Sequence, residues 1–159
     1  MKSIFLFFLN MLVVNSMRAQ ADASFAGTTK SVCAEVLGAG IGFSANFDSR
    51  FKGQNGLGFR AGLGFVPVTG ITILTIPLGV NYITSKRSSH FEAEFTGTVF
   101  TSTNGKFNGD KISPVFLFPH VGYRYSKPSK SFLGRIYGGP MFFGGITLPF
   151  AGISLGYTL

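Results

Sequence analysis

The sequence is poor in charge, cysteine and long apolar runs, and it contains no tryptophan. Charged residues make up 13% of the 159 residues, about half the usual share of a soluble domain. The single cysteine, Cys33, cannot form an intramolecular disulfide and is interpreted as a structural strand residue. After residue 20 no apolar run is long enough to cross a bilayer as a helix, although the mean hydropathy is positive. A chain that is apolar on average, but never continuously so, is typical of a transmembrane β-barrel.

Glycine and phenylalanine are abundant, with 22 and 19 residues, and much of the chain alternates apolar with small or polar residues. The final stretch, residues 149–159, shows the pattern most clearly. A period of two indicates a strand with one face in an apolar medium. In a closed barrel such a last strand pairs with the first and leaves no open edge. The apolar positions are Ala151, Ile153, Leu155, Tyr157 and Leu159, and the positions between them are Gly152, Ser154, Gly156 and Thr158.

The same alternation predicts an all-β fold, an eight-stranded antiparallel up-and-down transmembrane β-barrel. An even strand number is the rule for single-chain outer-membrane barrels. With both termini in the periplasm, the longest polar connection, residues 102–113, is extracellular. The connections 52–56, 85–90 and 126–131 are then periplasmic turns, as such barrels prefer. The predicted strands are residues 30–37, 41–51, 57–66, 71–84, 91–101, 114–125, 132–143 and 149–159.

The N-terminal segment has the features of a secretory signal peptide. Lys2 supplies the positive charge, residues 4–14 form the apolar core, and Ala19-Gln20-Ala21 fits the small-x-small cleavage pattern. The sequence therefore predicts a cleaved signal peptide at residues 1–21 and one barrel domain at residues 22–159.

Charged residues inside the predicted strands fall on the glycine-bearing face. A charge at membrane depth needs a partner, so this face is predicted to line a plugged lumen and to hold an ion network. Glu92 and Glu94 are about 7 Å apart along one strand and suit acid–base chemistry, but the arginines on the same face favour a structural role. The predicted network is Arg60, Glu92, Glu94, Arg124, Arg135 and Asp48.

No arrangement for nucleophilic catalysis, metal ligation or phosphate binding is recognisable, so neither an enzyme nor a cofactor is expected. His120, predicted on the lumen face, is interpreted as a hydrogen-bonded core histidine. Three prolines, Pro77, Pro119 and Pro140, lack the N–H that a barrel strand donates. They are interpreted as bulges or strand bends near the outer rim. The alternative is a local weakness in strand pairing that admits a lipid chain from the side.

The formal net charge of +8 comes from dispersed cations in or beside predicted turns. Export excludes most nucleic-acid roles, so the expected partners are anionic lipid head groups or lipopolysaccharide phosphates at the rims. The alternative is that these cations serve solubility alone. They include Arg50 and Lys52, Lys86 and Arg87, Lys106 and Lys111, and Lys127 and Lys130.

Three segments resemble recurring stretches of the small outer-membrane β-barrel families of the OmpA/OmpX architectural type, among them uncharacterised barrels of Gram-negative envelopes. They are Glu35-Val36-Leu37-Gly38, Gly122-Tyr123-Arg124-Tyr125 and residues 152–159. The resemblance implies an outer-membrane location, insertion by the barrel-assembly machinery and no catalytic residues. The chain departs from that pattern at Leu159, where such barrels more often end in Phe or Trp.

The expected function is therefore structural or surface-interacting, in a monomeric outer-membrane barrel with a plugged polar lumen. Two alternatives remain open: a lipid-binding or lipid-A-modifying barrel enzyme, and a narrow porin-like channel. A soluble periplasmic barrel is the rival at the level of the fold.

Overall fold

The computed structural model describes residues 29–53, 55–68, 71–84, 88–102, 115–126 and 131–159. The predicted signal peptide, residues 1–21, lies outside them. Among the described residues no helix is long and apolar enough to cross a bilayer.

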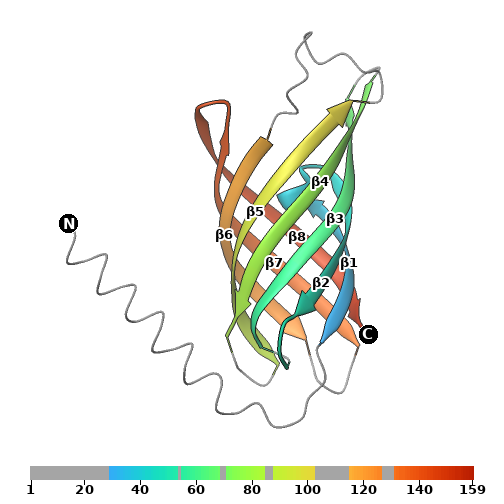
Figure 1. Cartoon of the computed structure of the whole chain (residues 1–159), viewed down its shortest axis with the longest axis vertical. Coiled ribbons are helices and arrows are strands. Elements are labelled where there is room, and N and C mark those ends of the chain that lie inside the picture. The colour runs from blue at the N-terminus through green and yellow to red at the C-terminus, as the bar shows by residue number, and fades with distance from the viewer. Residues whose placement is uncertain (1–28, 54, 69–70, 85–87, 103–114, 127–130) are drawn as a thin grey trace, which may run out of the picture.

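The described residues form one closed antiparallel barrel of eight strands, in which each strand pairs with its neighbours in the chain and β8 pairs with β1 (Figure 1). The predicted strand number and up-and-down order are confirmed. The strands are β1 Lys30–Leu37, β2 Phe43–Arg50, β3 Gly56–Val68, β4 Ile71–Ile83, β5 Ser89–Ser102, β6 Val115–Ser126, β7 Phe132–Phe143 and β8 Ile146–Thr158.

The seam between β1 and β8 closes the sheet as predicted. It runs from the pair Ser31–Thr158 to the pair Leu37–Gly152. The start of β1 and the end of β8 therefore lie at one end of the barrel, called the lower end here, and Figure 1 shows the C-terminus there. The upper part of β8, residues 146–151, pairs with β7 in the described structure, above the last residue of β1.

Two predicted boundaries are wrong because the turns differ from those expected. Residues 144–148 were expected to lead into the last strand, but Gly144 and Gly145, with φ of 56° and 81°, complete the turn alone. Two residues with positive φ make the tight hairpin turn that glycine favours. The second strand was expected from residue 41, but it begins at Phe43 because a 3-10 turn, Gly38–Gly40, precedes it.

The Gly38–Gly40 turn folds into the barrel instead of projecting from it. Ala39 is fully buried, and side chains from the opposite wall hold the turn. The Thr98 hydroxyl donates to the Ala39 carbonyl at 2.7 Å, and the Thr75 hydroxyl donates to the Gly40 carbonyl at 3.0 Å. Figure 1 shows this connection at mid-height, whereas the β3–β4 and β7–β8 hairpins reach the upper end. The turn thus closes the interior like an internal plug.

Ladder pairing is interrupted at Pro77, Pro119 and Pro140, the three prolines predicted to mark bulges or bends, but the register does not shift there. The β3–β4 ladder stops at Ala61–Leu78 and resumes at Gly64–Thr75, on either side of Pro77. The β6–β7 ladder is interrupted between Leu117–Phe142 and Val121–Gly138, where the register sets Pro119 opposite Pro140. At each interruption the same number of residues is unpaired on both strands. A bulge would add a residue to one strand only, so these sites are gaps in pairing and the predicted bulges are absent from them.

Strand alternation separates two chemically opposite faces. The outward face carries large apolar side chains on every strand, such as Leu63 at 69% exposure and Val121 at 67%. The inward face of the lower half carries charged and amide side chains that are almost fully buried, as the next section describes. Cys33 lies buried on the inward face of β1, in agreement with its interpretation as a strand residue. The lower half of the barrel is therefore apolar outside and polar inside, the reverse of a soluble barrel.

Leu37, at the end of β1, holds an unusual backbone conformation, with φ 61° and ψ −139°. This region is close to one that only glycine adopts freely, at a cost of about 1–3 kcal/mol for other residues. The Leu37 side chain is 49% exposed, so little packing is lost on its removal. We expect Leu37→Gly to raise the free energy of unfolding by about 1 kcal/mol, measured by urea titration of the refolded barrel in detergent micelles.

The neighbouring Val36→Gly is the matched control, because Val36 is outward, 43% exposed and has no positive φ. It should lower the stability by about 1 kcal/mol or more, through the backbone entropy of glycine and the loss of the half-buried side chain. An equal loss in both variants would show that Leu37 carries no strain.

Candidate functional site

The candidate site is the charged interior of the lower half of the barrel. The six predicted network residues come from five strands, and every one points inward with at most 4% exposure. The strands that carry them pair in the registers given by the ladders, so inward positions of neighbouring strands meet. They are Asp48 on β2, Arg60 on β3, Glu92 and Glu94 on β5, Arg124 on β6 and Arg135 on β7.

Arg60 lies at the centre of the network. Its Nη1 donates to Glu35 Oε2 at 2.8 Å, and its Nη2 donates to Glu94 Oε2 at 2.7 Å. All three side chains are fully buried. One guanidinium therefore links β1, β3 and β5 across the interior, with its planar fork divided between two carboxylates.

Arg135 joins the two glutamates of β5. Its Nη2 donates to Glu92 Oε1 at 2.8 Å and to Glu94 Oε2 at 3.0 Å. Thr96 completes the Glu94 carboxylate by donating to Oε1 at 2.8 Å. Each of the paired carboxylates thus accepts a hydrogen bond from Arg135, which favours the structural role considered for them.

A second group lies nearer the lower end. The Asp48 carboxylate accepts from Arg50 at 2.6 Å and from Arg124 at 3.3 Å. Asn81 lies between the groups: its Nδ2 donates to Asp48 Oδ2 at 2.7 Å and to Glu92 Oε1 at 3.1 Å. Arg50 Nη2 also donates to Asn81 Oδ1 at 2.5 Å. Asn81 therefore connects the two charge clusters into one network.

Sequence reasoning missed two charged members of this network. Glu35 was not assigned to it, because β1 has the weakest alternation in the chain. Arg50 was placed beside a turn with lipid phosphates as its expected partners. That expectation is wrong for Arg50, which is the last residue of β2 and is 2% exposed. Arg50 lies two residues after Asp48 on the same strand, so its side chain points to the same face, and this spacing was the available signal.

The complete network balances charge. Four carboxylates face four guanidinium groups, so the formal net charge of +8 arises entirely outside it. Balance is required because an uncompensated buried ion costs several kcal/mol. The members are Glu35, Asp48, Glu92, Glu94, Arg50, Arg60, Arg124 and Arg135.

Glycines provide the clearance that the long side chains need. A Cβ placed on Gly58 would collide with the Arg50 guanidinium, and one placed on Gly62 would collide with the Asn46 side chain. The predicted sharing of one face by glycines and charges is therefore a packing requirement. Side chains fill an eight-strand lumen, and the glycines opposite decide where arginines fit.

An aromatic stack covers the network from above. The Tyr137 ring stacks on His120 at 4.4 Å between centroids, and His120 stacks on Phe118 at 4.5 Å. The Arg60 and Arg135 guanidinium carbons lie 5.6 and 5.4 Å from the Tyr137 centroid, within cation–π range. His120 Nε2 lies 3.6 Å from Glu94 Oε2, and Nδ1 is 3.0 Å from the Phe118 carbonyl. His120 is thus packed in the core at the boundary of the network.

Above this stack the interior becomes apolar, which the sequence analysis did not anticipate. A buried cluster includes Ala39 of the inward turn with Phe100, Phe116 and Phe118. The available signal was the loss of alternation in Val115-Phe116-Leu117-Phe118 and in Met141-Phe142-Phe143, where both faces are apolar. The interior therefore has two tiers, a charged lower tier and an aromatic upper tier. The Gly38–Gly40 turn, which connects β1 to β2, contributes Ala39 to the upper tier.

Among the residues that the structure describes, no group of three or more His, Cys, Asp or Glu side chains is arranged to hold a metal ion. The arrangement cross-links strands: its hydrogen bonds connect residues as far apart in the chain as Ser31 and Arg124. The ion-paired side chains thus fill the interior and hold the strands together, as a plug would.

The chain matches no protein-family model and no curated protein. In fold it is similar to the N-terminal β-barrel domain of Pseudomonas aeruginosa OprF, with a TM-score of 0.56 and 9% sequence identity. The match covers 83% of this chain and 96% of that chain. The likeness supports the predicted barrel architecture and, at this identity, transfers no residue roles.

Removal of Arg60 tests the importance of charge balance. Arg60→Met leaves Glu35 and Glu94 buried beside a neutral side chain, and breaking one partner of a buried pair costs about 3–5 kcal/mol. We expect a loss of this size in the free energy of unfolding, measured in urea with the barrel refolded in detergent micelles. Adding Glu35→Gln should recover part of it, because one unpaired charge is removed.

Lys52→Met is the control for loss of a cation, because Lys52 is exposed and has no ion pair in the described structure. Its effect should stay within about 0.5 kcal/mol. A loss below about 1 kcal/mol in Arg60→Met would contradict the central place of Arg60.

Proposed function

We propose that the protein is an integral outer-membrane barrel whose interior is a plug and whose role is structural or surface-interacting. The observation that carries this proposal is the inverted polarity of the barrel. Outward apolar side chains form a continuous belt, and the ion network lies inside. A belt of this kind is stable in hydrocarbon and unstable in water.

The strand lengths support a bilayer environment. The strands β3 to β8 have 12 to 14 residues, and a tilted membrane-spanning strand needs about 9–11. Closure of the sheet by the β1–β8 seam leaves the lower barrel without an open edge, which hydrocarbon requires. In this proposal the lower end faces the periplasm and the upper hairpins face outward. The barrel is a monomer, and its partners are membrane lipids, lipopolysaccharide and the barrel-assembly machinery.

No catalytic activity is proposed. Every carboxylate of the interior network forms an ion pair with an arginine, which supports a structural role for these side chains. One observation favours the second candidate, a lipid-binding or lipid-modifying barrel. The interrupted pairing where Pro119 faces Pro140 weakens the wall beside a groove that includes Gly138 and Gly139. Turnover of lipid A or phospholipid by the purified barrel would establish this second candidate in place of the first.

Fractionation tests the membrane location directly. We expect the full chain, expressed in a Gram-negative host, to sediment with the outer membrane and to migrate faster on a gel before heating than after. The folded barrel resists detergent, and heating unfolds it. Recovery in the soluble periplasmic fraction, with no shift in mobility, would overturn the proposal in favour of a soluble barrel.

Conductance tests the plug. The arginines, the aromatic stack and the inward turn fill the interior, so we expect no single-channel steps from the purified barrel in a planar bilayer. A porin inserted in the same bilayer serves as the positive control. Stable steps from the unmodified barrel would favour the narrow porin-like channel considered from the sequence.

A further inference from the structure

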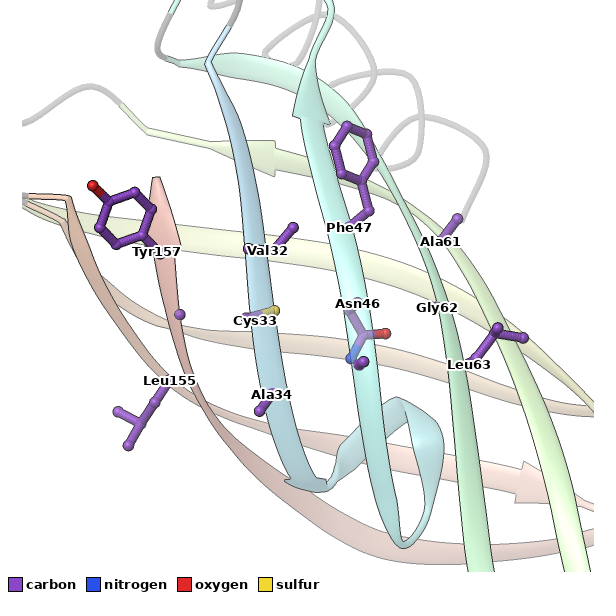
Figure 2. A pocket seen from close by; sticks show the side chains of 12 residues that line it. Val32, Cys33, Ala34, Asn46, Phe47, Ala61, Gly62, Leu63, Leu155 and Tyr157 are labelled. Carbon is purple, nitrogen blue, oxygen red and sulfur yellow. The ribbon is translucent and has the colours of Figure 1, made fainter. Parts of the chain in front are cut away.

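A shallow groove of about 650 Å³ crosses the outer wall where β8, β1, β2 and β3 lie side by side. Figure 2 shows Leu155 and Tyr157 on one flank and Leu63 on the other, with Phe47 on β2 between them. The register explains the depression. Ala34 of β1 pairs directly with Ala45 of β2, so two small side chains meet at its centre.

Large side chains surround that alanine pair. Ala34 is opposite Leu155 on β8, and Ala45 is opposite Leu63 on β3. Leu155 is 57% exposed and Leu63 is 69% exposed, so both stand clear of the wall. The groove thus has apolar flanks and an apolar floor, and it falls within the volume range of small-molecule sites.

Two lysines lie at the foot of the groove. Lys30 is outward on β1, four residues before Ala34, a distance of about 13 Å along a strand. Backbone hydrogen bonds hold the chain on both sides of Lys52 beside Thr29, the residue before Lys30: the Thr29 N–H donates to the Gly53 carbonyl at 3.2 Å, and the Arg50 N–H donates to the Thr29 carbonyl at 3.0 Å. Both lysines are exposed, and neither forms an ion pair among the described residues.

We propose that this groove is a specific site for one anionic phospholipid of the lower leaflet. Its phosphate binds between Lys30 and Lys52, and one acyl chain lies along β1 over Ala34 and Ala45. The charge complementarity identifies the occupant, because two unpaired cations at the rim of an apolar groove fit a molecule with an anionic head and an apolar tail. The inference rests on the proposed membrane location.

Native mass spectrometry of the purified full-length barrel tests the site. The probes are phosphatidylglycerol and phosphatidylcholine with identical acyl chains, supplied in equal amounts in detergent. We expect one retained phosphatidylglycerol, favoured over phosphatidylcholine about 25-fold, since each of the two lysines contributes about a fivefold factor toward an anionic head group. Lys30→Gln with Lys52→Gln should bring the two lipids to equal retention.

Ala45→Leu fills the floor of the groove and should abolish retention of both lipids. Ala151→Leu, outward on β8 and away from the groove, is the matched control and should retain the lipid as the unmodified barrel does.

Three outcomes would overturn the site: equal retention of both lipids by the unmodified barrel, unchanged binding by Ala45→Leu, or a protein dimer that Ala45→Leu disrupts. The last would assign the groove to a second copy of the chain. Heat-modifiable mobility of the same preparation confirms that each variant is folded, and fractionation reports the membrane location separately. Failure of the lipid site is therefore distinguishable from failure of the proposed function.

Discussion

The structure depends on the neutralisation of buried charge. Arg60 sits between Glu35 and Glu94 at 2.8 and 2.7 Å, with all three side chains removed from solvent. Such a pair contributes little net stability relative to apolar packing, but it is costly to break. Its main consequence is specificity, because only one register of β1, β3 and β5 brings all three groups together. A slip of one residue would turn every charge toward the apolar exterior.

The other features of the interior follow from that constraint. Glycines such as Gly58 stand opposite the arginines because a Cβ there would displace the guanidinium. The Tyr137 ring covers Arg60 and Arg135 on one side and contacts the aromatic upper tier on the other. It thus separates a region that requires charge pairing from one that requires none. The inward turn completes the separation. Its carbonyls accept hydrogen bonds from Thr75 and Thr98, and its apolar residue Ala39 packs in the cluster of phenylalanines.

Most of the fold was predictable because a period of two is a direct physical record of two different environments. The bounds of β1 and β7 were predicted to the residue, and all six proposed network residues were placed on the inward face. Alternation shows which face of the sheet a side chain is on, but it shows neither the height of that side chain in the barrel nor the residues that it contacts. It therefore missed Arg50, which looked like a turn residue, and the inward course of Gly38–Gly40, which resembled an ordinary hairpin turn. Where both faces are apolar, as at Val115-Phe116-Leu117-Phe118, alternation carries no information and the aromatic tier escaped notice.

The unequal strand lengths fix the height of the proposed membrane. The β1–β2 hairpin ends at Leu37 and Phe43, which pair with Gly152 and Phe65. Above this level residues 146–151 of β8 have a partner on the β7 side alone in the described structure. An open edge is not tolerated in hydrocarbon, so in the proposed location this part of β8 lies beyond the acyl chains of the upper leaflet. Pro149 lies in the same segment and has no N–H to leave unpaired. In the proposed membrane location, the shortest hairpin of the barrel, and not its longest strands, therefore sets the upper boundary of the wall that contacts the acyl chains.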